Sequence, residues 1–492
     1  MGKYSIPEDI RTLKPKGSVV KLISGNYYVY EQKHIKDETS GKWKIKSGKY
    51  LGKITRENGY IPVETSYLLE EDSVLEFGNY ALAYMLGDSL KEKLETVFDK
   101  ETTSKLYVLS ILHLINGFSY TYQISSLFDQ SFFKLIYPNF KFGEVGLTSL
   151  YSMLGRKKKS VEKFQKLLYQ DSKSIAIDGH CIASSSLNND LARKGNKAVK
   201  FVNNQVNLIM GYSIDSGAPV FAEVVTGDTL DSVSLDTVLS SKDIKNTLFV
   251  VDKGYYSLEN LKLLTQNNCH YVMPPKENSK TYKDFVANAN YTKEYFVYKT
   301  KTTKTVIYYD YEKVSEDYFI YSFRDLSQHA IECEDYESKI KLGKENFTTE
   351  KYNEVKEKFG TITLICDYEM KPEEVFTSYK NRWKIETFYN YLKNNLEFEA
   401  LHCQDYYVEQ GLSFIILLTS NLHYELVKKV YSTGLNLDHI LLDLRSIKLK
   451  NTNEMWQATS STKKRIALFN NLNTDLPKLI SRVNELYKAA KN

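Results

Sequence analysis

Short apolar runs alternate with turn residues and one helical stretch between residues 175 and 267, and this alternation constrains the fold more than any other feature. Runs of this length, rich in Val, Ile and Phe, are typical of strands buried in a sheet. The stretch 258–267 has instead the spacing of an amphipathic helix. The pattern predicts an α/β fold with strands at 175–177, 206–212, 220–225 and 248–251.

Acidic residues follow two of these predicted strands. Asp178 comes directly after the first run, and Asp252 comes directly after the last. Open α/β sheets bind their ligands beyond the carboxyl ends of the strands. We therefore expect both aspartates to lie at a functional edge of the sheet.

A helix predicted from Pro372 carries a second group of polar residues, Tyr379, Arg382, Glu386 and Lys393. At about 100° per residue, these four side chains fall within about 60° of one another around the helix. Periodicity alone favours an exposed face with an Arg–Glu ion pair, which is the commonest use of charges on a helix.

The two aspartates change this interpretation, because Glu386 would complete a set of hard oxygen ligands. Mg²⁺ prefers such ligands, and phosphoryl transfer on DNA commonly uses two ions about 3.5–4 Å apart. We predict that the catalytic, metal-binding residues are Asp178, Asp252 and Glu386. The remaining residues of the stripe are expected to bind DNA phosphates: Tyr379, Arg382 and Lys393.

The net charge of +5 hides an uneven distribution. Residues 1–60 contain 13 Lys and Arg against 6 Asp and Glu, so this stretch carries +7 and the remainder −2. Within it, Lys42, Lys44 and Lys46 alternate with apolar residues, which places them on one face of a predicted strand. Two interpretations are equally favoured: the lysines bind DNA phosphates, or they form a solvated face.

The cysteines and the apolar runs indicate the cellular compartment. Five scattered cysteines with no C-x-x-C pair argue against a disulfide framework and against a structural zinc site. The first ten residues lack the apolar region of a secretion signal. No apolar run approaches the roughly 20 residues that span a bilayer. We expect a soluble, reduced, cytoplasmic protein with no membrane partner.

The predicted helix also matches a known signature. Its sequence YKNRWKIETFYNYLKNNL contains the pattern Y-x2-R-x3-E-x6-K, which is typical of one group of insertion-sequence DDE transposases. Residues 250–257 (VVDKGYYS) resemble the second-aspartate motif of that family, and residues 175–178 resemble the first. The turn TGDTLD at 226–231 is similar to the family's G-N-x-x-D turn, with Asp228 where Asn is usual. The resemblance covers roughly residues 75–425.

The resemblance implies an RNase H-like mixed-sheet catalytic core that is interrupted by a β-rich insertion between the second Asp and the Glu. Apolar, Tyr-rich runs between 291 and 324 independently indicate such an insertion. The predicted parts are a basic strand-rich DNA-binding region (1–75), a helical region for DNA-end binding (76–172), the first part of the core (173–272), the insertion (273–360), the second part of the core with the Glu helix (361–425), and a helical dimerisation region (426–492).

The resemblance also implies an activity and its partners. The activity is Mg²⁺-dependent hydrolysis at the terminal inverted repeats of a transposable element, followed by strand transfer into target DNA. Two Mg²⁺ ions, which Mn²⁺ can replace, would be held by the three carboxylates. The partners would be double-stranded DNA and a second copy of the chain in a synaptic complex, associated with the nucleoid. The alternatives are a catalytically silent or regulatory DNA-binding relative, and a metal-dependent nuclease without strand transfer.

The sequence departs from the family at two places. His180 stands where the family often has Ser or Thr, and we interpret it as a structural residue rather than a DNA or metal contact. The tryptophans Trp43, Trp383 and Trp456 all lie outside the insertion, so Tyr or Phe would have to serve in any base flipping. Trp383 is expected to pack in the core.

Overall fold

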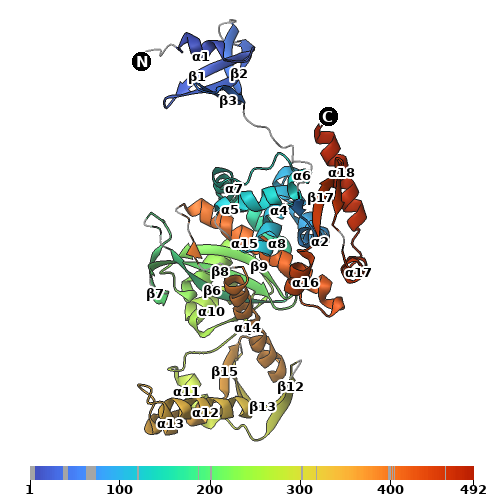
Figure 1. The fold of residues 1–492 in the computed structure, drawn as a ribbon. Helices are drawn as coiled ribbons and strands as arrows, with labels where there is room; N and C mark the ends of the chain where they lie inside the picture. Colours follow the sequence, from blue (N-terminus) through green and yellow to red (C-terminus); the bar gives the residue numbers. More distant parts are fainter. Residues whose placement is uncertain are drawn as a thin grey trace. The chain divides into compact units, whose positions relative to one another are not determined.

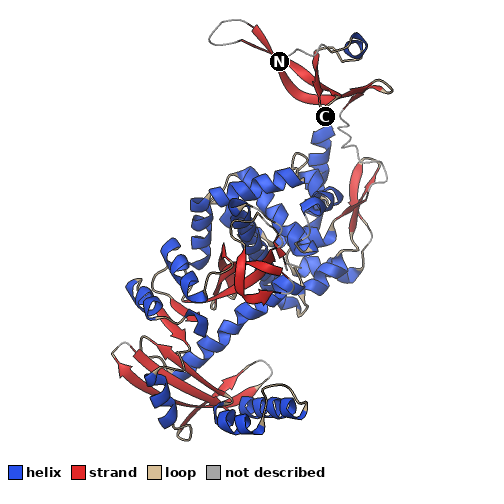
Figure 2. Cartoon of the chain, turned by 90° about the vertical axis from the view of Figure 1, so that its left-hand side faces the viewer, coloured by secondary structure: helices blue, strands red, loops and turns tan. Residues whose placement is uncertain are grey.

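The protein, described from a computed structural model, divides into two compact units. The first comprises residues 1–73 with 451–454, and the second comprises residues 74–450 with 455–492. Figures 1 and 2 show the elements of both units. The described residues are 6–36, 43–62, 74–118, 121–184, 186, 188–199, 202–300, 303–316, 318–396, 400–401, 403, 405–459 and 461–491.

The first unit is a small antiparallel sheet with one short helix. Its four strands, within the described residues, follow the order β1-β2-β3-β4. Ser24 and Gly25 have positive φ angles of 50° and 82° between β1 and β2, as two-residue hairpin turns favour. Ile10 packs with Val29 and Ile54 on one face of the sheet. The elements are α1 (Glu8–Thr12), β1 (Ser18–Ile23), β2 (Asn26–Lys36), β3 (Trp43–Thr55) and β4 (Gly59–Pro62).

The strands predicted between residues 18 and 62 are therefore confirmed in the described part of this unit. Of the three lysines predicted to bind DNA, Lys42 lies outside the described residues. Lys44 and Lys46 lie in β3, opposite Ile35 and Lys33 of β2. The structure does not describe the side chains of these residues, so their role stays a prediction.

Helices occupy the start of the second unit, as the spacing of leucines predicts. They surround the long helix α15 (Tyr406–Val430), which packs against α4 and α7. Gly155 and Gly411 permit the α7–α15 crossing, because a Cβ on either glycine would lie 2.0 Å from a carbonyl oxygen of the other helix. The elements are α2 (Gly78–Leu86), α3 (Asp88–Glu95), α4 (Lys100–Asn116), α5 (Thr121–Gln130), α6 (Phe133–Ile136), α7 (Glu144–Arg156) and α8 (Lys158–Tyr169).

A mixed sheet of eleven strands, within the described residues, forms the centre of the second unit. Its order is β12-β13-β14-β15-β11-β10-β6-β8-β7, with β9 paired to β8 and β16 paired to β6. Strands β6, β10 and β11 are parallel, whereas β8 runs antiparallel to β6 and to β9. The α/β prediction is thus confirmed. The first elements are β6 (Ser174–Ser184), β7 (Arg193–Val199), β8 (Val202–Ser213), β9 (Ala218–Thr226), α9 (Asp231–Ser241), β10 (Leu248–Val251), the 3₁₀ turn η1 (Lys253–Tyr255), α10 (Leu258–Gln266) and β11 (His270–Met273).

Strand β6 does not end at Asp178, contrary to the prediction. It continues to Ser184, because its antiparallel neighbour β8 accompanies it as far as the pair Ala183–Gln205. Its parallel neighbour β10 is the strand that ends, at Val251. Asp178 therefore lies inside a strand, at the point where the adjacent strand stops.

The β-rich stretch predicted between 291 and 324 extends the central sheet. Strand β14 pairs with β15, and β15 pairs with β11. The helical stretch that follows begins at Leu326, earlier than predicted, because Asp325 caps α12 by accepting from the backbone N–H groups of Ser327 and Gln328. The elements are α11 (Lys280–Asn288), β12 (Glu294–Lys299), β13 (Lys304–Ser315), β14 (Tyr318–Asp325), α12 (Leu326–Lys341), α13 (Thr349–Val355), the turn η2 (Lys356–Lys358) and β15 (Thr361–Cys366).

The C-terminal part is helical as predicted, except for a hairpin that the sequence did not indicate. Strand β17 of this hairpin pairs with β5, and Trp456 of β18 is fully buried. None of the helices in the described residues is both long and apolar enough to cross a membrane. The elements are β5 (Val74–Glu76), α14 (Pro372–Asn394), β16 (Ala400–Leu401), the turn η3 (Tyr431–Thr433), α16 (Leu437–Leu444), β17 (Lys448–Thr452), β18 (Met455–Ala458), α17 (Lys463–Asn471) and α18 (Leu476–Lys491).

Candidate active site

The register of two parallel strands brings Asp178 and Asp252 together. Ile177 of β6 pairs with Val251 of β10, so the two aspartates are the next residues of neighbouring strands. Adjacent strands lie about 4.8 Å apart, which places both carboxylates at one edge. This agrees with the expectation from the sequence, although only Asp252 follows a strand end.

Backbone N–H groups orient both carboxylates. Asp178 Oδ1 accepts from the N–H of Gly179 at 2.9 Å, and Asp252 Oδ1 accepts from the N–H of Lys253 at 2.7 Å. The Lys253 ammonium is directed to Glu277, whose carboxylate lies 2.5 Å from it. Lys253 thus forms its ion pair with Glu277 rather than with the adjacent Asp252.

Helix α14 crosses this edge and contacts both aspartates. Its first turn contains Pro372, as predicted, and the helix packs against β6 and β10. Near its middle, the Tyr379 hydroxyl lies 3.4 Å from Asp252 Oδ1. Three turns later, the Tyr389 hydroxyl donates to the carbonyl oxygen of Asp178 at 2.8 Å. Glu386 lies between these two anchor points, on the same side of the helix.

The Glu386 carboxylate is held by Arg382, one turn earlier. Arg382 Nη2 lies 2.7 Å from Glu386 Oε1, and the guanidinium carbon lies 5.4 Å from the centre of the Tyr379 ring. Arg382 is only 9% exposed. Burial lowers the pKa of Arg382, but Tyr379, Asp252 and Glu386 raise it more, so the net pKa is raised. The guanidinium therefore stays charged within this cluster.

Tyr379 keeps its proton in the same environment. Burial raises its pKa to about 12, with Arg382 opposing the shift and Asp252 adding to it. A protonated phenol can donate a hydrogen bond to the Asp252 carboxylate. The structure thus brings together four of the predicted residues in contact: Asp252, Tyr379, Arg382 and Glu386.

The family of the chain follows from a comparison of its sequence with protein-family models. The family model described as "Transposase DDE domain" matches residues 164–422, more than half of the chain. The chain belongs to the DDE transposase family. Membership makes it an enzyme of the polynucleotidyl transferase and nuclease type that acts in DNA transposition, a family that generally uses divalent metals. The resemblance inferred from the signature on α14 is confirmed.

Comparison with other proteins adds little to the family assignment. Among solved structures, the chain is similar to the one described as the piggyBac transposase synaptic complex with hairpin DNA, with a TM-score of 0.38 and 10% sequence identity. The match covers 75% of this chain and 80% of that one. No curated protein matches the sequence.

The donor set of this DDE-family protein fits a divalent metal, although the carboxylates are not yet grouped around one point. Among the described residues, no three His, Cys, Asp or Glu side chains are arranged to hold an ion. Glu386 is instead paired with Arg382 through Oε1. Its other oxygen, and Oδ2 of Asp252, accept no hydrogen bond from the described residues. These two oxygens suit Mg²⁺, which prefers hard ligands.

Two residues of helix α14 differ from what the sequence predicted in this DDE-family protein: one contact of the site was missed, and the burial of one side chain was predicted wrongly. Tyr389 was missed, although its offset of three from Glu386 places it on the same stripe. Trp383 was expected in the core but is 67% exposed, because this half of α14 buries the opposite side, which carries Ile385 and Phe388. Lys393, the last residue of the signature, is half-buried near the C-terminal end of the helix.

His180 lies against helix α14, and its assignment as a structural residue stays a prediction. Its ring stacks on the Tyr389 ring, with centroids 4.9 Å apart and an angle of 22° between the planes. The same tyrosine anchors α14 to β6. His180 therefore supports the position of the helix that carries Glu386.

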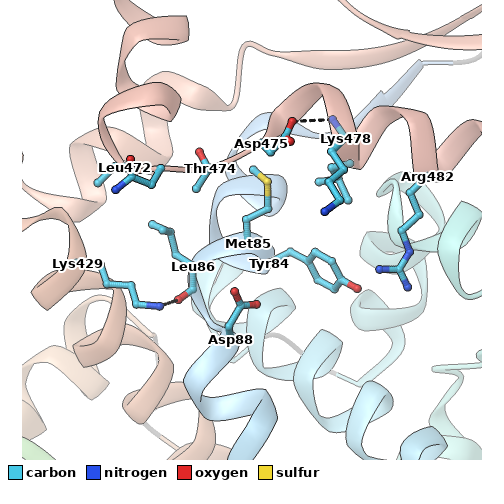
Figure 3. Close-up of a pocket in the computed structure, with 12 residues that line it drawn as sticks. Tyr84, Met85, Leu86, Asp88, Lys429, Leu472, Thr474, Asp475, Lys478 and Arg482 are labelled. Carbon is cyan, nitrogen blue, oxygen red and sulfur yellow. Dashed lines mark hydrogen bonds between the residues drawn. The ribbon is translucent and has the colours of Figure 1, made fainter.

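A cavity of about 490 Å³ lies elsewhere in the second unit of this DDE-family protein, and Figure 3 shows the residues that line it. It lies among α2, the end of α15 and the start of α18, and its lining includes Lys429, Lys478, Arg482 and Asp88. Lys429 donates to the carbonyl oxygen of Leu86. None of the three predicted catalytic acids lines this cavity, so it is not the candidate active site.

Proposed function

We propose that this protein is a cut-and-paste DNA transposase that hydrolyses phosphodiester bonds at the terminal inverted repeats of an insertion sequence and joins the freed ends to target DNA. The observation that carries the proposal is the arrangement around α14. Tyr379 and Tyr389 on one stripe contact the Asp252 carboxylate and the Asp178 backbone, and Glu386 lies between them.

Strand order supports an RNase H-like core for this site. The order β9-β8-β6-β10-β11 has its first, fourth and fifth strands in sequence parallel to one another, and its second antiparallel to the first. Asp178 lies on the first of these strands, and Asp252 directly follows the fourth. The strands β12–β14 then represent the proposed insertion.

The catalytic roles follow from the chemistry of carboxylates. Asp178, Asp252 and Glu386 would hold two Mg²⁺ ions, which Mn²⁺ can replace. When bound, these ions activate the attacking oxygen and stabilise the leaving oxygen. In the first step water attacks the phosphorus and the bond to the 3′ oxygen breaks, which leaves a 3′-hydroxyl. In the second, this hydroxyl attacks a phosphodiester of target DNA, the bond from that phosphorus to the target's 3′ oxygen breaks, and the target strand leaves with a 3′-hydroxyl.

Arg382 is proposed to position Glu386 in addition to its predicted contact with DNA. The guanidinium is enclosed by Tyr379 and Glu386, and its Nε has no hydrogen-bond partner in the described residues. A single charged hydrogen bond, from Arg382 Nη2 to Glu386 Oε1, holds the carboxylate in its present orientation. Glu386 must turn from Arg382 toward the aspartates to complete a metal site.

The remaining assignments concern DNA and assembly. Tyr379 and Lys393 flank Glu386 on α14, where they would contact the phosphates next to the cleaved bond. We propose that the first unit and the helices before β6 bind the transposon ends. Residues 426–492 would form the dimer of a synaptic complex.

The decisive experiment replaces Glu386 by Gln and measures Mg²⁺-dependent cleavage of DNA that contains the inverted repeats flanking the reading frame. Loss of a metal-binding carboxylate should reduce the rate at least about a hundredfold. Glu373→Gln, an exposed acid in the first turn of the same helix, should cleave at the wild-type rate. Full cleavage by Glu386→Gln would contradict the assignment.

The products distinguish the alternatives. Nicked DNA with no joined product, when target DNA is supplied, would identify a nuclease without strand transfer. Binding of end DNA with no cleavage in Mg²⁺ or Mn²⁺ would identify a regulatory relative.

A further inference from the structure

The sheet of the first unit has one face that its own core does not use. Ile10, Val29 and Ile54 form the core on the opposite face. The strand register places Lys21, Tyr28 and Lys53 side by side on the unused face, one on each of three adjacent strands.

Two further tyrosines extend this row. Tyr30 pairs with Tyr50 across β2 and β3, and the Tyr50 ring lies 5.5 Å from Tyr30 and 5.9 Å from Tyr28 between centroids. The rings are tilted by 53° and 59°, so they do not stack on each other. Tyr50 is 39% exposed. We call Lys21, Tyr28, Tyr30, Tyr50 and Lys53 the aromatic face.

The structure of the unit does not account for these tyrosines. None of their three hydroxyls forms a hydrogen bond within the described residues, unlike Tyr60, whose hydroxyl donates to the carbonyl oxygen of Leu51 at 2.8 Å. Among the described residues, none of these three rings belongs to the apolar core of the unit. Their clustering favours a role in binding.

Charge on the aromatic face indicates an anionic partner. The Lys21 ammonium lies 5.1 Å from the centre of the Tyr30 ring, and Lys53 is exposed beside Tyr28. In the described part of the strands, the register places no acidic side chain on this face, since Glu31 belongs to the opposite one. The ammonium groups of Lys21 and Lys53 would therefore repel a cationic ligand.

We propose that the aromatic face binds single-stranded nucleic acid, with unpaired bases stacked on Tyr28, Tyr30 and Tyr50 and phosphates held by Lys21 and Lys53. Aromatic rings interleaved with cations bind single strands without sequence preference. Tyr28 and Tyr30 lie roughly 7 Å apart along β2. Each ring can therefore stack on a different base of the strand. A duplex does not fit as well, because its bases are stacked inside the helix and offer no free ring surface.

The test measures the affinity of the full-length protein for a labelled oligo(dT) by fluorescence anisotropy. EDTA is present, so that the proposed catalytic site makes no contribution through metal-dependent chemistry. The double variant Tyr28→Leu/Tyr30→Leu should bind at least about tenfold more weakly, because each stacked base contributes strongly to affinity. Tyr28→Phe/Tyr30→Phe keeps both rings and should bind as the wild type does.

Two further ligands separate stacking from charge. An abasic oligonucleotide of the same length should bind the wild type and the Leu variant with equal affinity. The affinity for a duplex should fall less than twofold from the wild type to the Leu variant. Lys21→Gln/Lys53→Gln should lower the salt dependence of oligo(dT) binding by about 0.7 per lysine in the log–log slope. Far-ultraviolet circular dichroism confirms that each variant keeps its strands.

The proposal is overturned if the Leu and Phe variants bind oligo(dT) equally. It is also overturned if the abasic strand or the duplex loses as much affinity as oligo(dT) does. Because the readout is binding without metal, these results stand apart from the outcome of the Glu386→Gln cleavage test.

Discussion

The two sheets of this protein differ in how their faces are covered, and the difference determines how function is distributed over each. In the central sheet, Phe249 and Val251 pack into one apolar cluster and Val250 packs into another, so both faces of the sheet are buried at β10. The polar residues of the candidate active site lie at the edge where β10 ends. The sheet of the first unit is covered on one face and carries exposed Tyr and Lys on the other.

DNA cleavage at the central sheet should consequently depend on single residues, whereas DNA binding by the first sheet should depend on many small contributions. Replacing Asp252 by Asn tests the first half of this contrast. It removes a charged ligand at the strand edge without changing shape, so cleavage of end DNA should fall at least about a hundredfold while end binding stays within a few-fold. A residual rate near the wild-type value would mean that function is not concentrated at this edge.

The sequence predicted the ingredients of this edge better than their arrangement. The apolar runs at 175–177 and 248–251 were predicted to be strands, and in the structure they are adjacent and parallel. Continuous apolar runs are typical of parallel strands that are buried on both faces. The end of β6 could not be predicted, since it depends on how far the partner strand β8 continues. Periodicity placed Glu386 with Arg382, but it could not show that Arg382 is buried.

Other features depend on distant contacts that a local pattern does not contain. The backbone of Trp456 is held by Asn484, 28 residues along the chain, which accepts from its N–H at 2.7 Å and donates to its carbonyl oxygen at 2.9 Å. Neither residue signals a hairpin by itself. Trp383, in contrast, is exposed although it is large and lies in a long helix. The division into six domains remains a prediction.

The stability of the second unit should depend on pH, because this unit buries an ionisable carboxyl group. Glu409 on α15 is completely buried, and burial raises its pKa from 4.5 to about 7, with Asn189 opposing and Asp190 and Asp405 adding to the shift. The folded protein thus holds a proton that the unfolded chain loses above pH 4.5. Stability should fall by about 2–3 kcal/mol as the pH rises from about 4.5 to 7.

Thermal unfolding across this range checks the expectation, with Glu409→Gln as the matched variant. The amide cannot ionise, so the variant should lose less stability than the wild type over the same interval. Parallel pH profiles for the two proteins would show that the pKa of Glu409 is the same in the folded and the unfolded protein.

A smaller effect is expected at the anchor between α14 and β6. Tyr389→Phe removes the hydrogen bond to the Asp178 carbonyl oxygen but keeps the ring that stacks on His180. We expect a loss of about 1 kcal/mol of stability and a reduction in cleavage rate of roughly tenfold. If Tyr389→Phe has the stability and the cleavage rate of the wild type, other contacts hold helix α14 in place.

The smallest effect is expected in the first unit. Lys44→Gln/Lys46→Gln should weaken duplex binding modestly and reduce its salt slope by about 0.9 per lysine. Lys14→Gln serves as a control, because that ammonium already donates to the Ser18 carbonyl oxygen at 2.6 Å. An abrupt loss of all DNA binding from the double variant would instead show that function in this unit is concentrated, as in the central sheet.

The most direct test of the central claim is metal-directed cleavage of the protein backbone. Fe²⁺ can be bound in place of Mg²⁺, and ascorbate with peroxide then generates radicals that cut the chain next to the ion. If Asp178, Asp252 and Glu386 form one site, the fragments will end near these three positions, and Asp252→Asn will abolish all three cuts together. Cuts elsewhere, or cuts that persist unchanged in Asp252→Asn, would contradict the shared site.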